Sequence, residues 1–373
     1  MIDLVKKNLK FFYKNLLIYF FSKFYGKPKL IKKNAKDQFI QEHEIILEKN
    51  KYKVFQLFNG SIYTNSNDTT AYISKNGNLS SASMQFSKFD NINSLNSKVS
   101  KNETLASGTP RFKKKYNGNI LSLLSGGASK SNFTHWFTDV IPRIKIFNEK
   151  FNLKKIDKFY VPSLKYKFQV ETLEYLGIKK DKIITSENFK HICADSIFAT
   201  SHPCHFHPMK VKKWSLNYIR NLYLPQKKTN KFKKIFIERD QLGLLDFDNL
   251  KRSKNLRVLL NETEIKEYLK LQGFKIIKPE EFSFLKQVQI FSNANFIIGM
   301  YGAAMMMISF CKKKTKILEL KPLKGGNEFK NISNLIGLKH KQINLKPIFK
   351  SSTPQNGLIN CPINIIKKEL SYK

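Results

Sequence analysis

Short apolar runs and segments with helical periodicity alternate along the second half of the chain. The apolar runs predict strands, and the segments between them predict helices. The predicted strands are KIFIE (234–238), FKII (274–277), NFIIG (295–299), TKILEL (315–320) and KQINL (341–345). The predicted helices run from a capping box at Asn261 and Glu264 to Leu271, over 283–294 and over 329–338. This alternation predicts a parallel, doubly wound sheet.

The first half of the chain shows two successive patterns. Residues 40–110 alternate short apolar pieces with turns rich in Asn and Ser, which predicts short strands and long loops. From residue 118 the α/β alternation begins. Strands are predicted at NILSLLS (119–125), KFYVP (158–162), KIIT (182–185) and DSIFATS (195–201), and helices at 168–178 and 211–224.

A polar, lysine-rich segment after Pro225 has the composition of a linker. We therefore predict a basic aromatic helix in residues 1–30, an α/β domain in residues 31–225 and a second α/β domain in residues 226–373. Two doubly wound halves joined in this way enclose a cleft. Ligands of such sheets bind beyond the carboxyl ends of the strands.

The N-terminal segment allows two interpretations. Lys7, Lys10 and Lys14 form a basic stripe on a helix whose other positions are mostly leucine and aromatic residues. This composition is typical of a helix that lies in a membrane interface, and equally of an amphipathic helix docked on its own protein. The longest apolar run, Leu16–Phe21, is too short to cross a bilayer, and no cleavable signal peptide is evident.

The segment NFTHWFTDVIPRI (132–144) has polar residues at helical spacing. Asn132, His135, Asp139 and Arg143 lie three, four and four positions apart, so a helix places them on one face. Pro142 removes one helical N–H and is expected to bend the helix near Asp139. A polar row beside a bend predicts a binding or catalytic face.

Charge and cysteine content narrow the class of protein. Lys and Arg number 67 against 28 Asp and Glu, which gives a formal net charge of +39. Only six of the basic residues are Arg, the residue favoured in base and phosphate recognition, and Lys is spread along the whole chain. We therefore expect no nucleic-acid partner. The four cysteines lack a C-x-x-C pair, which is typical of reduced thiols in an intracellular protein.

Polar and small residues follow the predicted strands of the second domain at the carboxyl ends. Arg239 follows the first strand, Glu319 lies near the end of the fourth, and Arg257 and Asn261 come before a helix. The GMYGAA turn supplies Gly299, Tyr301, Gly302 and Ala303, whose backbone can approach a phosphate closely. Together these residues predict a nucleotide site. Purely structural roles are the alternative. The glycines could allow tight packing of a strand against a helix, and Arg257 could cap a helix or form an ion pair on the surface.

The segment SHPCHFHP contains four potential zinc ligands, which are His202, Cys204, His205 and His207. Closed zinc sites usually recruit two pairs of ligands, and no second pair accompanies this one. We therefore expect a loop that lines a cleft and no bound metal.

The motifs described above resemble those of glycosyltransferase family 61. The HWFTDVIPR segment resembles the family's His-Trp/Phe-x-x-Asp-x-x-Pro-Arg pattern. In the second half the matching stretches are ERD, LRVLLNETEI, GFKIIKPEEFSFLKQVQIFSNANFIIGMYGAA and KILELKP. The resemblance covers roughly residues 118–345 as an ordered set, which makes it more specific than any single motif.

The resemblance implies a GT-B-like fold with two Rossmann-like domains facing a cleft. It implies an inverting transfer from a nucleotide-sugar donor, without metal or other cofactor, to a glycan or lipid-linked glycan of the capsule, lipopolysaccharide or exopolysaccharide. The expected location is the cytoplasm, on the inner face of the membrane. Arg239, Arg257, Asn261 and Glu319 match donor positions, and His135 and Asp139 match the acceptor face.

The sequence departs from the family at two positions. Tyr301 replaces a His, and Met307 replaces an Asn. A phenol donates a hydrogen bond but supplies no cation near neutral pH, and a thioether does neither.

Two residues are candidates for the catalytic base. We expect Asp139 or His135 to act, with Asp139 preferred, and Arg239 and Arg257 to stabilise the leaving group. The alternatives are an inactive glycan-binding or assembly protein on the same scaffold and, less favoured, a basic nucleic-acid-binding protein.

Overall fold

The computed structural model describes residues 2–65, 69–85, 99–124, 130–204, 210–225 and 232–371. The chain divides into two compact units, Met1–Tyr218 and Ile219–Lys373. The division lies inside helix α6 (Lys213–Tyr223), shortly before the predicted boundary at residue 225. Most of the predicted linker, residues 226–231, lies outside the described residues, as do His205 and His207.

The first unit begins with helix α1 (Ile2–Tyr25), as the sequence predicts for residues 1–30. Within the described part of the chain, no helix combines the length and the apolar character needed to cross a membrane. The four cysteines form no disulfide.

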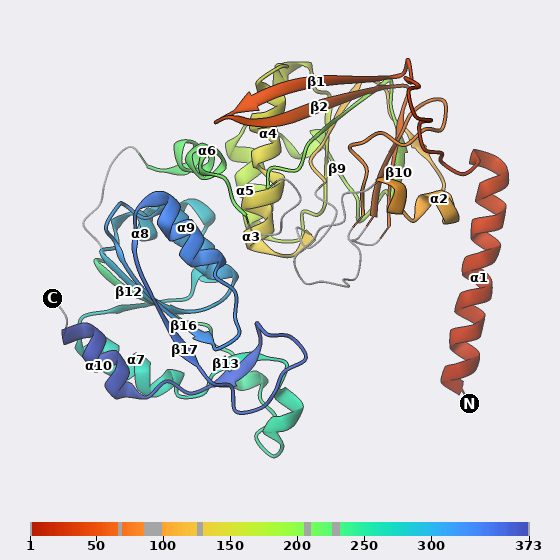
Figure 1. Ribbon diagram of the computed structural model, residues 1–373. Coiled ribbons are helices and arrows are strands. Elements are labelled where there is room, and N and C mark those ends of the chain that lie inside the picture. The colour runs from red at the N-terminus through yellow and green to blue at the C-terminus, as the bar shows by residue number, and fades with distance from the viewer. Residues whose placement is uncertain are drawn as a thin grey trace. The chain divides into compact units, whose positions relative to one another are not determined.

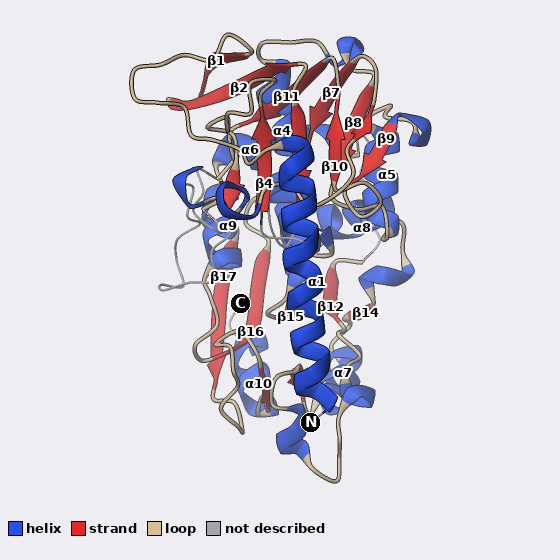
Figure 2. Ribbon diagram, turned by 90° about the vertical axis from the view of Figure 1, so that its right-hand side faces the viewer, coloured by secondary structure: helices blue, strands red, loops and turns tan. Residues whose placement is uncertain are grey.

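The first unit contains two sheets. One has the order β1-β2-β11-β7-β8-β9, with β1 (Ile40–Leu47), β2 (Asn50–Phe58), β7 (Asn119–Ser122), β8 (Lys158–Val161), β9 (Ile183–Thr185) and β11 (Ser196–Thr200). The other has the order β5-β4-β3-β10-β6, with β3 (Ser61–Thr64), β4 (Thr69–Ile73), β5 (Met84–Gln85), β6 (Lys114–Lys115) and β10 (His191–Cys193). Figure 2 shows strands β2, β11, β7, β8 and β9 side by side.

A shared core joins the two sheets. Phe55 and Ile120 of the first sheet pack in one cluster with Ile62, Tyr72 and Ile192 of the second. Helix α4 (Pro142–Asn148) contacts β2 and β11 of the first sheet. The remaining helices of this unit are α2 (Thr104–Ser107), α3 (Phe133–His135) and α5 (Lys167–Tyr175).

The doubly wound sheet predicted for the first unit is correct only in part. Strands β11, β7, β8 and β9 are parallel, and they are the four strands predicted from residue 118 onward. Strands β1 and β2 add an antiparallel hairpin, and a second sheet packs where a doubly wound fold has helices. The edge strand β1 is largely exposed, and its Glu42 and Glu44 pair with Lys53 and Lys51 of β2.

The second unit has the parallel sheet that the sequence predicts. Its order is β14-β12-β15-β16-β17, and every neighbouring pair is parallel. The strands are β12 (Lys234–Ile237), β14 (Lys275–Ile277), β15 (Phe296–Met300), β16 (Lys316–Pro322) and β17 (Lys339–Leu345). Strands β12, β15 and β16 are buried almost continuously, as strands covered on both faces are, whereas the edge strands β14 and β17 are partly exposed.

Helices cover both faces of this sheet. They are α7 (Glu262–Leu271), α8 (Phe284–Asn293), α9 (Glu328–Ile336) and α10 (Ile363–Ser371), and a 3₁₀ helix spans Ala303–Phe310. Figure 1 shows α7 and α10 on one side of the sheet and α8 and α9 on the other. A small parallel pair, β13 (Arg257–Leu259) and β18 (Gly357–Ile359), completes the unit.

Asn261 begins α7 as predicted, but its side chain does not form the predicted capping box. Its Oδ1 accepts from the Cys361 N–H at 3.1 Å, and its Nδ2 donates to the Cys361 carbonyl at 2.8 Å. The Glu264 carboxylate accepts from the same amide nitrogen. Asn261 therefore ties the start of α7 to the segment after β18.

We expect Asn261→Ala to destabilise the protein by about 1–3 kcal/mol, because two buried backbone groups of Cys361 lose their partner. The urea midpoint measured by far-UV circular dichroism checks this. Asn334→Ala, at an exposed position of α9, is the matched control and should leave the midpoint nearly unchanged. Equal shifts in the two variants would show that the Asn261 contacts contribute little.

Candidate functional site

The predicted helix at 132–144 forms, but it is not a continuous α-helix. A π-helical turn, Trp136–Val140, lies between α3 and α4, and the Ile141 N–H donates to the Trp136 carbonyl five residues back. Pro142 is the first residue of α4 and has no N–H to continue the α-helical ladder. The bend predicted near Asp139 is therefore a π-turn, a distortion that is frequent at functional sites.

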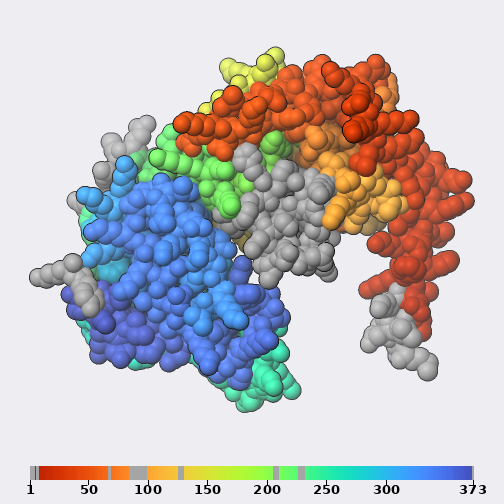
Figure 3. Space-filling view, in the orientation of Figure 1, coloured from red at the N-terminus to blue at the C-terminus, as the bar shows by residue number. Residues whose placement is uncertain are grey.

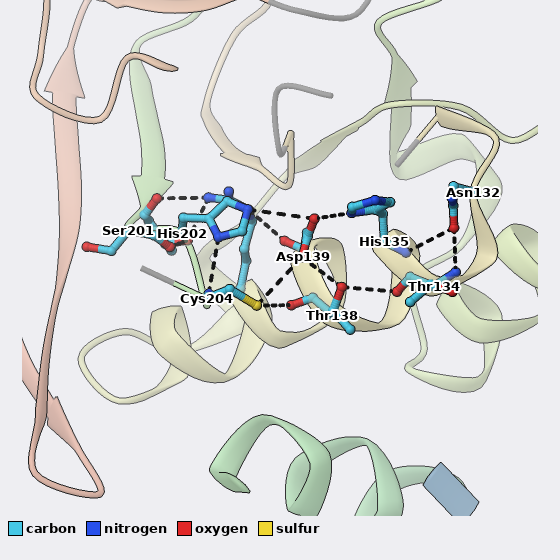
Figure 4. Close-up of polar contacts among 10 residues, drawn as sticks. Asn132, Thr134, His135, Thr138, Asp139, Ser201, His202 and Cys204 are labelled. Atoms are coloured by element: carbon cyan, nitrogen blue, oxygen red, sulfur yellow. Dashed lines mark hydrogen bonds and ion pairs between the residues drawn. The ribbon is translucent and has the colours of Figure 1, made fainter. Parts of the chain in front are cut away.

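The Asp139 carboxylate lies at the centre of a hydrogen-bonded cluster. Its Oδ2 is 2.7 Å from His135 Nδ1 and 3.7 Å from His202 Nε2. Its Oδ1 accepts from the Thr138 hydroxyl at 2.7 Å and lies 3.8 Å from the Cys204 thiol. Figure 4 shows the carboxylate between the two imidazole rings.

These neighbours keep Asp139 ionised. Burial alone raises the pKa of this carboxyl, but the interactions with His135 and His202 hold it far below its usual range. Burial and the charge of Asp139 raise the pKa of the Cys204 thiol well above its ordinary value, so Cys204 remains a thiol. The cluster thus contains one carboxylate surrounded by donors.

Only part of the predicted polar row lies together at this cluster. Asn132 caps α3, because its side-chain oxygen accepts from the Thr134 and His135 N–H groups. Arg143 is fully buried, and its guanidinium donates to the carbonyls of Asp139 and Thr200. His135 is the most exposed of the three residues that carry the His-Asp-Arg pattern, with 19% of its side chain accessible. Arg143 therefore supports the helix from inside and does not present a ligand-binding face.

Asp139, His202 and Cys204 also have the spacing of a metal site, with ligand atoms within 4.8 Å of one another. The tautomer of His202 argues against a metal ion. Its Nδ1 accepts from the Cys204 N–H at 3.1 Å, so the ring hydrogen is on Nε2, the atom directed at Asp139. A metal-ligating histidine donates through its second nitrogen, whereas this one accepts. His202 is better suited to donate to Asp139 than to bind a cation.

In the second unit, Arg239 and Arg257 converge where the strand order reverses. Arg239 follows β12, and Gly302 follows the neighbouring β15. A side chain at Gly302 would place its Cβ 2.2 Å from Arg239 Nη1 and 3.6 Å from Arg257 Nη1. Ligands of open α/β sheets bind at this reversal of strand order. The backbone at Gly302 therefore passes beside two guanidinium groups at the expected ligand position.

The two guanidinium groups lie in an electrostatically unfavourable arrangement. Burial and the charge of Arg257 lower the pKa of Arg239 to about 10, and burial also lowers the pKa of Arg257. Arg239 Nε donates to the Arg257 carbonyl, and among the described residues no acceptor bonds to the two terminal nitrogens of Arg239. An anion that contacts both groups would relieve their repulsion.

Tyr301 holds Arg257 in place. The Arg257 guanidinium lies 4.8 Å from the centre of the Tyr301 ring and donates to the Tyr301 carbonyl. The Tyr301 hydroxyl donates to Glu328 at 3.0 Å. The Tyr301 side chain thus positions the Arg257 guanidinium group. Met307 is fully buried in the 3₁₀ helix and serves packing.

The other predicted donor residues have structural partners. A Cβ at Gly299 would meet Ile237 at 3.1 Å, which fits the packing alternative, and Ala303 begins the 3₁₀ helix. Glu319 is fully buried, and its Oε2 accepts from His340 and Gln342. These contacts favour a role for Glu319 inside the sheet over direct contact with a ribose.

The family model described as Glycosyltransferase 61 matches residues 133–318, from the first residue of α3 to the residue before Glu319. The chain belongs to glycosyltransferase family 61. Membership indicates glycosyl transfer, which uses a sugar donor and an acceptor. No curated protein matches this family 61 chain significantly.

Several residues of the two clusters were not identified from the sequence of this family 61 chain. Glu262 holds the loop after β12, since its carboxylate accepts from the N–H groups of Arg239 and Asp240. Asn356 accepts from Arg257 Nη2 at 3.1 Å across almost a hundred positions of sequence. Glu262 lies inside the LRVLLNETEI stretch, but nothing in that stretch indicates this role, and Asn356 lies outside the matching stretches. The sequence predicts His202 on a loop that lines a cleft, and its distance from the 132–144 segment conceals its contact with Asp139.

We expect long-range ¹H–¹⁵N spectra near neutral pH to show His202 as the neutral Nε2–H tautomer. Burial lowers its pKa, and the Cys204 N–H occupies Nδ1. Added Zn²⁺ should leave its signals and the melting temperature unchanged. An Nδ1–H tautomer, or a Zn²⁺-dependent rise in melting temperature that Cys204→Ser abolishes, would contradict this assignment.

Proposed function

We propose that the chain is an inverting, metal-independent glycosyltransferase that uses a nucleotide-sugar donor. The observation that carries the proposal is the pair of guanidinium groups beside Gly302 in a family 61 chain. Arg239 and Arg257 bind the diphosphate of the donor and neutralise the charge that develops as it leaves. They supply the positive charge that a metal ion would otherwise supply, so the proposal needs no metal.

His135 is the proposed base, which reverses the preference expressed from the sequence. Asp139 is nearly buried, and its lowered pKa makes it a weak base. Its ionised carboxylate accepts from His135 Nδ1–H, which leaves the lone pair of the ring on Nε2. His135 is accessible enough to meet an acceptor, and Asp139, which also contacts His202, fixes its orientation.

The transfer proceeds by a single displacement. His135 Nε2 takes the proton of the acceptor hydroxyl, and the hydroxyl oxygen forms a bond to the anomeric carbon of the sugar. The bond from that carbon to the diphosphate oxygen breaks, and the electron pair leaves with the nucleoside diphosphate. One displacement inverts the anomeric configuration. The GT-B arrangement, in which two lobes share one donor, is part of this proposal.

We further propose that the acceptor is a capsular, lipopolysaccharide or exopolysaccharide glycan, free or lipid-linked, and that transfer occurs in the cytoplasm at the inner face of the membrane. Helix α1 supports this location, because it carries exposed aromatic and aliphatic residues together with lysines.

We expect Gly302→Ala to weaken binding of the cognate nucleoside diphosphate by at least about tenfold, since the added methyl group displaces the Arg239 guanidinium. A thermal-shift screen of nucleotide sugars and diphosphates identifies the ligand, and calorimetry gives the affinity. Gly243→Ala is the matched control, because a Cβ there meets nothing within 4 Å.

If Gly302→Ala and Gly243→Ala bind the nucleoside diphosphate with equal affinity, the donor does not bind at this site. A donor that binds without any transfer to glycan acceptors would favour the inactive glycan-binding protein instead. Steeply salt-dependent binding to duplex DNA, with no nucleotide-sugar affinity, would favour the nucleic-acid binder.

We expect His135→Ala to lower kcat by about 10²–10⁴-fold while the donor Kd stays unchanged, because only the proton acceptor is lost. Asp139→Asn should also lower kcat, since the amide does not hold His135 in the required tautomer. His43→Ala, at a half-buried histidine on β1, is the matched control and should retain wild-type kcat. A folded His135→Ala variant with at least half of the wild-type kcat would exclude His135 as the base.

A further inference from the structure

Helix α1 contacts the rest of its unit through one end. Phe21 is buried against Phe112, with ring centres 4.9 Å apart, and Tyr25 packs edge-on against His191 at 5.4 Å. The Lys113 ammonium lies 4.7 Å from the centre of the Tyr25 ring. Figure 3 shows the red surface of α1 meeting the segment around α2 near this end. The C-terminal end of the helix is therefore docked.

The outer face of α1 is apolar and exposed. Leu9, Phe12, Leu16 and Phe20 recur at helical spacing, so they share one side of the helix. Their exposed fractions are 62%, 69%, 53% and 43%. Exposed apolar residues in a continuous row mark an interaction surface. Lys10 and Lys14 lie on a different side of the helix, the side that carries the buried Phe21. The apolar face matches a helix lying in a membrane interface, the first of the two interpretations drawn from the sequence.

A cavity of about 540 Å³ lies between α1 and the body of the unit. Its lining is cationic and partly apolar. Lys14 and Leu17 of α1 contribute one wall, and Arg111, Lys190 and Tyr63 contribute the other. Glu103 is the one acid among the described lining residues. Cations therefore outnumber anions in the cavity.

Two cations of the cavity, Arg111 and Lys190, repel each other. Burial and the charges of Arg111 and Lys130 lower the pKa of Lys190. The Tyr63 pKa is raised to about 12, mainly by burial, with Arg111 opposing the shift and Glu103 adding to it. His191 fixes this wall, since its Nδ1 bonds to the Arg111 carbonyl and its ring packs against Tyr63. A bound phosphate group would remove the repulsion and match the hydrogen-bond donors.

We propose that this cavity binds the phosphate of an anionic phospholipid in the membrane surface on which α1 lies. Lys14 connects the two features, because it lines the cavity on the same helix that exposes the apolar row. Leu17 and Pro110 supply apolar wall next to the cations, which suits the glycerol end of a lipid better than inorganic phosphate. The assignment rests on the proposed membrane location of the transferase.

Vesicle flotation at physiological salt tests this inference without any transfer assay. The full chain is mixed with phosphatidylcholine vesicles or with vesicles containing about one third phosphatidylglycerol. The cavity variant is Lys14→Gln/Arg111→Gln/Lys190→Gln. The control variant, Lys154→Gln/Lys179→Gln/Lys182→Gln, removes the same charge at exposed positions elsewhere in the unit. Melting temperatures confirm that both variants fold.

We expect the cavity variant to lose at least about tenfold in binding to the anionic vesicles, while the control stays within about twofold of wild type. The single variant Lys14→Gln should also bind the anionic vesicles less tightly than wild type. Because Lys14 is exposed, this variant still tests the proposal if the triple variant misfolds. Equal loss in the two triple variants would overturn the proposal, as would equal binding to both vesicle types. A cavity-dependent thermal shift with inorganic phosphate, without a cavity-dependent change in flotation, would overturn the lipid assignment. Donor affinity is measured separately, so failure here leaves the proposed transfer reaction untouched.

Discussion

The ionised Asp139 carboxylate is the interaction on which the rest of the first unit's site depends. A buried carboxylate is costly unless polar groups surround it. Here His135 and Thr138 form hydrogen bonds with it, and His202 Nε2 lies 3.7 Å away. These groups come from the helix itself and from the segment after β11, so the charge also favours the position of that segment. Arg143 adds a cation behind the carboxylate and bonds to the end of β11. The charge thus orders the helix, the neighbouring loop and the accessible imidazole together.

In the second unit, two cations lie close together although they repel each other. Burial and mutual repulsion disfavour Arg239 and Arg257, and fixed groups around them offset this cost. Glu262 anchors the backbone at Arg239, while the Tyr301 ring and Asn356 hold Arg257. Because the supports are in place without a ligand, the diphosphate proposed to bind here would meet a preorganised site. Tyr301, the departure from the family pattern, is one of these supports.

Local patterns in the sequence were sufficient to predict the main sheet of the second unit, but they did not predict the sheets of the first unit completely. The five parallel strands, β12 and β14 to β17, are all predicted from short runs of the sequence. The apolar signal is clearest in the central strands β12, β15 and β16, where both faces are buried. The second sheet of the first unit depends on β10 pairing with β3, more than a hundred residues away, which no local pattern reveals. From the sequence, Arg143 is placed on the binding face because α-helical spacing is applied to the whole segment, with a bend expected only from Pro142. The π-turn holds one more residue than an α-turn, and this directs Arg143 into the core.

The hairpin β1–β2 has a consequence for how the chain behaves in a crowded solution. A sheet that ends in an exposed strand offers unpaired backbone groups to any other chain, and this invites fibrous association. In a chain with so few acids, Glu42 and Glu44 are both on this last strand, where lysines of β2 accompany them. Charged side chains on an edge strand must shed their hydration before another strand can add to it. The edge of the sheet is therefore protected against self-association by charged side chains that also pair with lysines of β2.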